Sequence, residues 1–384
     1  MLMVGFVYAW SILSAPIAAE YPQWSASELS LSFTLCMAFF CLGGLGGGFA
    51  LRVSTPRRNL LLAALLFMCG FAIASRAQIP AMLYLGYGGL CGCASGVAYN
   101  AVMSTVPRWF PKRQGLVSGM LLMAFGSSSI VIGALFTALL PDSAGSWRRT
   151  LLCLGAAMAV VIAACSFCQK QPETGDTSSA AGAGGMTLPQ TLRCPAAWVI
   201  FIWAALLSGA GLAVIGQARA ICLSVDGGLS AAELSLLVGV ISVCNGLGRV
   251  LIGAVFDRLG YRWSMLMVGL LFISGAALIL AASCTASGLL LVMSFVLLGL
   301  GYGGVPISLA ALTRDFFGAE HYSENFAAIN LNLLVSSLGG TVSAALYDSF
   351  GSFVPTFILL AACAIISTFL LLHLKRPQFS RKMT

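Results

Sequence analysis

One arginine lies inside a long apolar run, and its guanidinium is the group in this chain best suited to bind an anion. Between residues 234 and 256 the formally charged side chain is Arg249 alone. The run has about 23 residues, or roughly 34 Å of helix, which is enough to cross a bilayer core of about 30 Å. A guanidinium within the hydrocarbon costs about 2.5 to 3.5 kcal/mol unless a carboxylate, carbonyl groups or a wet cavity meet it.

No acidic residue lies deep in any expected membrane span, so the sequence supplies no obvious partner for Arg249. An anionic substrate would supply one, through two parallel hydrogen bonds if it is a carboxylate. The alternative is a structural arginine, which backbone carbonyls and the fifth and tenth expected spans would satisfy.

The helix that carries Arg249 begins with a capping box, and this start occurs twice in the chain. The sequence SAAELSL at residues 230–236 has a serine and, three residues later, a glutamate, each of which can bond the other's backbone amide. Residues 25–31, SASELSL, repeat it at the start of another apolar run. The offset between these two stretches also aligns Gly48 with Gly253 and Arg57 with Arg262. This repeat predicts two related halves.

Composition places the whole chain in a membrane. Its 384 residues are 59% hydrophobic and 8% charged, whereas soluble domains carry about 25% charged residues. The net charge of +8 comes from cations in short loops, where they act as orientation signals, so nucleic-acid binding is rejected. The 13 cysteines and two histidines form no metal-ligand or redox pattern, and no cofactor is expected.

Apolar runs between charged and turn residues predict an all-α membrane protein with twelve transmembrane helices. The predicted domains are an N-terminal six-helix half at 1–169, a cytoplasmic linker at 170–193, a C-terminal six-helix half at 194–375 and a cytoplasmic tail at 376–384. The expected spans are residues 1–18, 27–51, 60–76, 80–105, 115–140, 148–168, 195–222, 231–256, 264–283, 287–313, 325–347 and 353–374.

The loop charges predict the orientation. With both termini cytoplasmic, the outer loops carry Arg76, Arg148 and Arg149, and the other loop cations fall inside. This predicts an integral protein of the plasma membrane, the inner membrane in bacteria. The first apolar run lacks a basic leader and indicates a membrane helix rather than a signal peptide, which leaves open a native start upstream of Met1.

A loop after the eighth span resembles the signature loop of the major facilitator superfamily. It consists of Gly253, Asp257, Arg258, Gly260 and Arg262 at that family's spacing. In such transporters the loop is a charge latch on the cytoplasmic side, which implies the same role here. The first copy departs from the pattern, because Arg52 stands at the position of the acid and Val53 at that of the arginine. The alternative is topogenic charge with a tight glycine turn.

Within that superfamily, three stretches resemble the oxalate/formate antiporter and monocarboxylate transporter-like group. They are YAWS at residues 8–11, RWFPKRQGL at 108–116 and NGLGR at 245–249. The resemblance implies two six-helix bundles with pseudo-twofold symmetry and a substrate site between them. It also implies that Arg249 contacts a substrate carboxylate. The other implied site residues are Asn245, Tyr8, Trp10, Tyr99, Asn100 and Tyr302.

Two departures from this group refine the expectation. Asn245 replaces the acid that carries the coupled proton in monocarboxylate transporters, and the eleventh span lacks the second cation of oxalate exchangers. A small organic monoanion is therefore expected, moved by exchange or facilitated diffusion with alternating access. The alternatives are efflux of a neutral or drug-like solute and a non-transporting membrane sensor derived from a carrier. No enzyme signature is present, and protein partners stay unknown.

Overall fold

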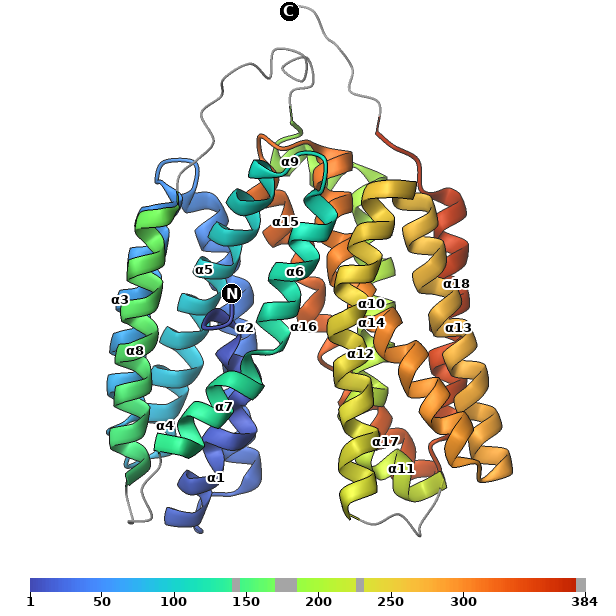
Figure 1. Cartoon of the computed structure of the whole chain (residues 1–384), viewed down its shortest axis with the longest axis horizontal. Helices are drawn as coiled ribbons and strands as arrows, with labels where there is room; N and C mark the ends of the chain where they lie inside the picture. Colours follow the sequence, from blue (N-terminus) through green and yellow to red (C-terminus); the bar gives the residue numbers. More distant parts are fainter. Residues whose placement is uncertain (140–145, 170–184, 226–230, 378–384) are drawn as a thin grey trace, which may run out of the picture. The chain divides into compact units, whose positions relative to one another are not determined.

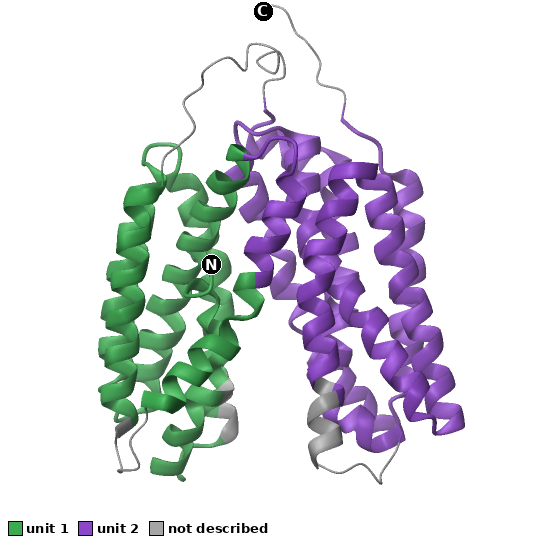
Figure 2. Ribbon diagram, viewed as in Figure 1, with its two compact units in different colours: residues 1–109, 124–176 green, residues 110–123, 177–384 purple. Residues whose placement is uncertain are grey.

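The computed structural model describes residues 1–139, 146–169, 185–225 and 231–377, and these residues form helices joined by short turns. They divide into two compact units, coloured separately in Figure 2. The first unit comprises residues 1–109 and 124–176, and the second comprises residues 110–123 and 177–384. The boundary therefore falls inside a helix, α6 (Gln114–Gly126), whose first ten residues group with the second unit.

In the first unit, α2 packs along α5 and α3 along α8 (Figure 1). Close contact of backbones explains the first of these pairs, since a Cβ added at Gly96 of α5 would overlap the carbonyl of Phe40 in α2. The helices of this unit are η1 (Val4–Ala9), α1 (Trp10–Glu20), α2 (Ala26–Ala50), α3 (Pro56–Ala74), α4 (Pro80–Leu83), the π-helix η2 (Tyr84–Cys91), α5 (Gly92–Thr105), η3 (Val106–Trp109), α7 (Ser128–Leu139) and α8 (Ser146–Cys168).

In the second unit, α14 packs against both α12 and α13, and α18 packs against α10 and α13 (Figure 1). The seam between α12 and α14 is lined by glycines, among them Gly248 and Gly303. The helices of this unit are α9 (Leu188–Arg193), α10 (Pro195–Gly216), α11 (Ala218–Val225), α12 (Ala231–Leu259), α13 (Tyr261–Thr285), α14 (Gly288–Phe317), α15 (Tyr322–Asn330), α16 (Asn332–Ser336), α17 (Gly339–Phe350) and α18 (Val354–His373).

Eleven helical segments of the described chain are long and apolar enough to cross a membrane. The first expected span, residues 1–18, does not form one of them, because η1 and α1 divide it into two short helices. Other expected spans are also subdivided. The fifth consists of α6 and α7, the seventh of α10 and α11, and the eleventh of α15, α16 and α17.

The predicted capping box of the first repeat is present at the start of α2. The Ser25 amide donates to Glu28 Oε2 at 2.8 Å, and the Glu28 amide donates to Ser25 Oγ at 3.2 Å. Glu28 therefore has a structural role at the helix start. Of the second copy, Ser230 and the side chain of Glu233 lie outside the described residues.

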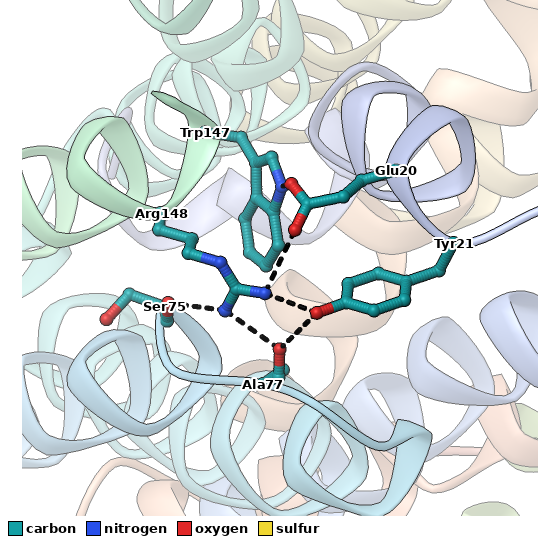
Figure 3. A network of polar contacts seen from close by, with 6 residues as sticks. All are labelled: Glu20, Tyr21, Ser75, Ala77, Trp147 and Arg148. Atoms are coloured by element: carbon teal, nitrogen blue, oxygen red, sulfur yellow. Dashed lines mark hydrogen bonds and ion pairs between the residues drawn. The ribbon is translucent and has the colours of Figure 1, made fainter. Parts of the chain in front are cut away.

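A polar network around Arg148 ties together three parts of the first unit (Figure 3). Arg148 at the start of α8 donates to Glu20 Oε1 at 3.2 Å, to the carbonyl of Ala77 at 2.8 Å and to the carbonyl of Ser75 at 3.3 Å. Trp147 donates to the other oxygen of Glu20 at 2.6 Å. The end of α1, the turn after α3 and the start of α8 are thus held by one guanidinium.

Candidate functional site

Arg249 is buried in the second unit and is incompletely hydrogen-bonded. Its side chain is 5% exposed, and its Nη1 donates to the backbone carbonyl of Leu122 in α6. Its Nε has no hydrogen-bond partner among the described residues. No ion pair formed by those residues involves Arg249. The arginine is therefore only partly satisfied by main-chain oxygen and keeps a buried donor that an anion could use.

Asn245 lies one helical turn before Arg249 on α12, on the same face. Its Oδ1 is buried and has no hydrogen-bond partner among the described residues. Two polar side chains of this helix thus keep unused hydrogen-bonding capacity next to each other. The ring of Tyr302 in α14 lies against Gly211 of α10, and its part in substrate binding stays a prediction.

Asp257 holds the start of α6. Its Oδ1 accepts from the amide of Gly115 at 2.7 Å and its Oδ2 from the amide of Leu116 at 2.8 Å. The first amides of a helix lack intrahelical acceptors and carry the positive end of the helix dipole, so a carboxylate is stabilised there. Backbone contact between Gly115 and Gly253 of α12 allows this approach.

The other residues of the predicted latch loop have different environments. Gly260 has φ 80° and ψ −179°, a conformation that is strained for other residues and explains the glycine between α12 and α13. Arg262 donates through Nε to the hydroxyl of Tyr261 at 3.2 Å, and Arg258 is exposed. The functional role of this loop stays a prediction.

Two of the predicted aromatic residues contact the same ring, that of Phe125, in the first unit. Tyr8 packs edge-on against Phe125 with ring centroids 5.4 Å apart, and Tyr99 lies 5.2 Å from the same ring. Phe40 of α2 joins them, 5.2 Å from Tyr99. Tyr8 is 40% exposed, so this cluster has an accessible edge. Sequence reasoning missed Phe40 and Phe125, since an isolated phenylalanine in an apolar helix carries no distinguishing signal.

Trp10 and Asn100 have other surroundings in that unit. Trp10 is buried with its ring 4.3 Å from that of Tyr87. Asn100 donates to the carbonyl of Gly44 at 3.0 Å and accepts from Ser104 at 3.0 Å, which ties α5 to α2. Their assignment to substrate binding stays a prediction.

A buried acid was also missed. Glu324, in the first turn of α15, is 1% exposed, and its Oε1 lies 3.9 Å from Nδ1 of His321. Glu324 stands just before the eleventh expected span, so it agrees with the expectation that no acid lies deep in a span, but its carboxylate is nevertheless buried. Its position beside a loop histidine gave no sign of burial.

The family profile of the Major Facilitator Superfamily matches residues 1–219 and 201–382, which together cover almost the whole chain. The chain belongs to the Major Facilitator Superfamily. This confirms the predicted superfamily, and the all-helical architecture confirms the predicted fold class.

Curated relatives of this superfamily member include transporters of the predicted group. The oxalate:formate antiporter of Oxalobacter formigenes is 24% identical over 98% of this chain and 90% of its own length. Monocarboxylate transporter 13 of Rattus norvegicus is 24% identical over 98% and 86% of the two chains. The uncharacterized MFS-type transporter YhjX of Escherichia coli is 26% identical over 87% and 82%.

Solved structures of other transport proteins share the fold. The proton:xylose symporter XylE aligns with a TM-score of 0.75 at 12% identity, over 97% of this chain and 94% of that one. A bacterial homologue of the iron transporter ferroportin aligns with a TM-score of 0.71 at 14% identity, over 97% and 96%. The superfamily member described here is an integral membrane transporter of a small solute, and it is not an enzyme.

Proposed function

We propose that this transporter carries a small organic monoanion of the monocarboxylate class, and that Arg249 binds the carboxylate of the substrate. The observation that carries the proposal is the buried guanidinium whose Nε lacks a partner among the described residues. A carboxylate would neutralise the charge and accept from that donor. Asn245, one turn away, could donate through its amide nitrogen to the same substrate, whereas its unpaired Oδ1 can only accept a hydrogen bond.

The names of two relatives support this substrate class, because an oxalate:formate antiporter and a monocarboxylate transporter both match nearly the whole chain. The fold supports alternating access, in which two halves move about a central site. We infer that the Asp257 contact with α6 is the charge latch of this cycle, since a carboxylate on two helix amides is stabilising yet reversible. Tyr8, Trp10, Tyr99, Asn100 and Tyr302 stay candidates for the rest of the substrate site.

Uptake of labelled formate, acetate and lactate by proteoliposomes tests this proposal. For the variant Arg249→Lys we expect uptake to fall by about a hundredfold, because loss of one partner of a buried charged pair costs about 2 to 5 kcal/mol and lysine lacks the planar fork. Arg76→Lys, at an exposed turn after α3, is the matched control and should transport normally. Normal uptake by Arg249→Lys would remove Arg249 from the site.

We propose that transport proceeds by exchange or facilitated diffusion. The buried Glu324 makes proton-coupled transport the alternative mechanism. A buried carboxylate is the usual proton carrier in transporters. An inward proton gradient should not stimulate uptake in the absence of internal substrate. Strong stimulation that disappears in Glu324→Gln would establish proton coupling through this residue.

A second candidate function is efflux of a neutral or drug-like solute, with Arg249 in a structural role. The hydrogen bond from Nη1 to the Leu122 carbonyl favours it. A non-transporting sensor is the third, and substrate-dependent counterflow would exclude it. We place the protein in the plasma membrane, the inner membrane in bacteria, with both termini cytoplasmic on the basis of the loop charges.

A further inference from the structure

Helix α12 contacts both ends of one segment of α6, residues 115–122. At one end the Asp257 carboxylate accepts from the amides of Gly115 and Leu116. At the other end Arg249 donates to the carbonyl of Leu122. Asp257 and Arg249 lie eight residues apart, or about 12 Å of helix, which is close to the rise of about 10 Å from Gly115 to Leu122 on α6. The segment 115–122 is thus held by an anion at its amide end and by a cation at its carbonyl end.

Between these two bonds the helices touch through their backbones. A Cβ added at Gly119 of α6 would overlap the carbonyl oxygen of Arg249, and one added at Gly253 of α12 would overlap the carbonyl oxygen of Gly115. Such small residues allow the close approach that brings the Leu122 carbonyl within reach of a side chain on the neighbouring helix. The Arg249 contact therefore depends on how closely α6 docks on α12.

The contact engages Nη1 of the guanidinium, whereas Nε, on the other side of the group, has no partner among the described residues. A guanidinium presents its donors in a fixed planar fork, and the edge formed by Nε and Nη2 faces away from Nη1. A carboxylate that reached the Nε and Nη2 edge would bind it side-on without displacing the Leu122 carbonyl.

We propose that the docked α6 segment positions Arg249 for its substrate, so that α6 docking and carboxylate binding strengthen each other. The Leu122 carbonyl fixes the guanidinium, which reduces the side-chain entropy lost when the carboxylate binds. By linkage, a bound carboxylate must then stabilise the docked α6 by the same factor. The inference rests on the proposed function, and it assigns positioning roles to Gly119, to the Leu122 carbonyl and, from the far end of the segment, to Asp257.

Two variants that leave Arg249 in place test this inference. In Gly119→Ala the added methyl group pushes α6 from α12, and in Asp257→Asn the anchor at the other end of the segment weakens. We expect each variant to bind formate, acetate or lactate about tenfold more weakly than the wild type by isothermal calorimetry, since a tenfold change corresponds to about 1.4 kcal/mol. Gly239→Ala, a change on α12 with open space around the new methyl group, is the matched control and should bind normally.

Hydrogen exchange on the unmodified protein supplies a measurement that needs no variant. Saturating carboxylate should slow exchange of the amides in residues 115–122, whereas a purely structural contact would not respond to ligand. Unchanged exchange with a bound carboxylate, or unchanged affinity in both variants, overturns the inference and leaves the proposed function standing. Failure of the wild type to bind any of the three carboxylates overturns both.

Discussion

The two copies of the repeated stretch carry different charged residues but share small residues at their helix contacts. In the second copy, Asp257 is bonded to the start of α6 and Arg249 is buried within α12. In the first copy, Arg52 takes the place of the acid and Gly44 that of the buried arginine. Both copies retain small residues where their helices meet neighbours. The repeat thus preserves a helix-packing scaffold while the buried arginine and the latch acid are confined to one half.

The loop of the first copy is basic and has no carboxylate of its own. Arg52 lies over the ring of Phe49, with 5.5 Å from the guanidinium carbon to the ring centroid, and Arg57 lies 4.2 Å above Phe167. An open cavity of about 540 Å³ adjoins it, lined by Thr55, Pro56, Arg57, Arg58, Leu61 and Gln169. Two arginines of this loop thus pack on aromatic rings, which supports the view that the two loops have different tasks.

Replacing the central residue of each copy, one at a time, should give the largest effect. Arg249→Met removes the charge and keeps an apolar side chain, so we expect carboxylate uptake to be abolished while the protein still folds. Gly44→Ala is its counterpart in the first half, where the new methyl group would meet the Gly96 carbonyl oxygen at 3.7 Å, an ordinary contact. Uptake by this variant should stay within about twofold of the wild type. Equal losses in the two variants would show that the halves share the chemistry.

The two loops should differ in stability as well. Asp257→Asn removes the charge from two helix-capping hydrogen bonds, and we expect it to lower the free energy of unfolding by about 1 to 3 kcal/mol. Arg52→Asn, at the matching exposed position, removes the contact with the Phe49 ring and should change it by at most about 1 kcal/mol. Chemical unfolding in detergent micelles measures both. A larger effect at Arg52 would refute the assignment of the latch to the second copy.

The Arg148 network should make the first unit sensitive to loss of one cation. Arg148→Met removes bonds to Glu20 and to two carbonyls, and we expect a loss of about 2 kcal/mol in thermal stability. Arg376 in the second unit pairs with Asp315 but is 60% exposed, so Arg376→Met should cost less than about 1 kcal/mol. Comparable melting shifts would indicate that the network contributes little.

The smallest expected effect concerns the capping box. Ser25→Ala leaves the Glu28 amide without its acceptor and should cost about 1 kcal/mol. Ser349→Ala, where the exposed hydroxyl bonds back to Ala345 within α17, is the control and should be nearly neutral. Thermal unfolding would decide, and no difference between the two would mean that the α2 start is stabilised by packing alone.

Much of the scaffold could be predicted from sequence because it depends on local patterns. The length of the apolar runs indicated nearly all the spans, and the spacing of Ser25 and Glu28 indicated the helix start. The helix interruptions at Ser127 and at Gln217 were missed. An apolar run continues through or close to each interruption, and the hydropathy of the sequence does not indicate where a helix is interrupted.

The polar contacts of the candidate site were less predictable, since they join residues far apart in the chain. Asp257 was recognised from its motif, but nothing local indicated that the Gly115 amide would be its donor. The acceptor of Arg249 is a backbone carbonyl, and every residue has one, so Leu122 carried no signal. Conversely, Asn100 was named as a site residue through the family resemblance, whereas in the structure its amide bonds to Gly44 and Ser104.

The interruption between α6 and α7 has a practical use. Met120 and Ile130 are both exposed, at 58% and 70%, and they lie on opposite sides of Ser127. Met120 groups with the second compact unit and Ile130 with the first. Spin labels or fluorophores at these two sites would therefore test, across a short stretch of chain, whether the two units move relative to each other during the transport cycle.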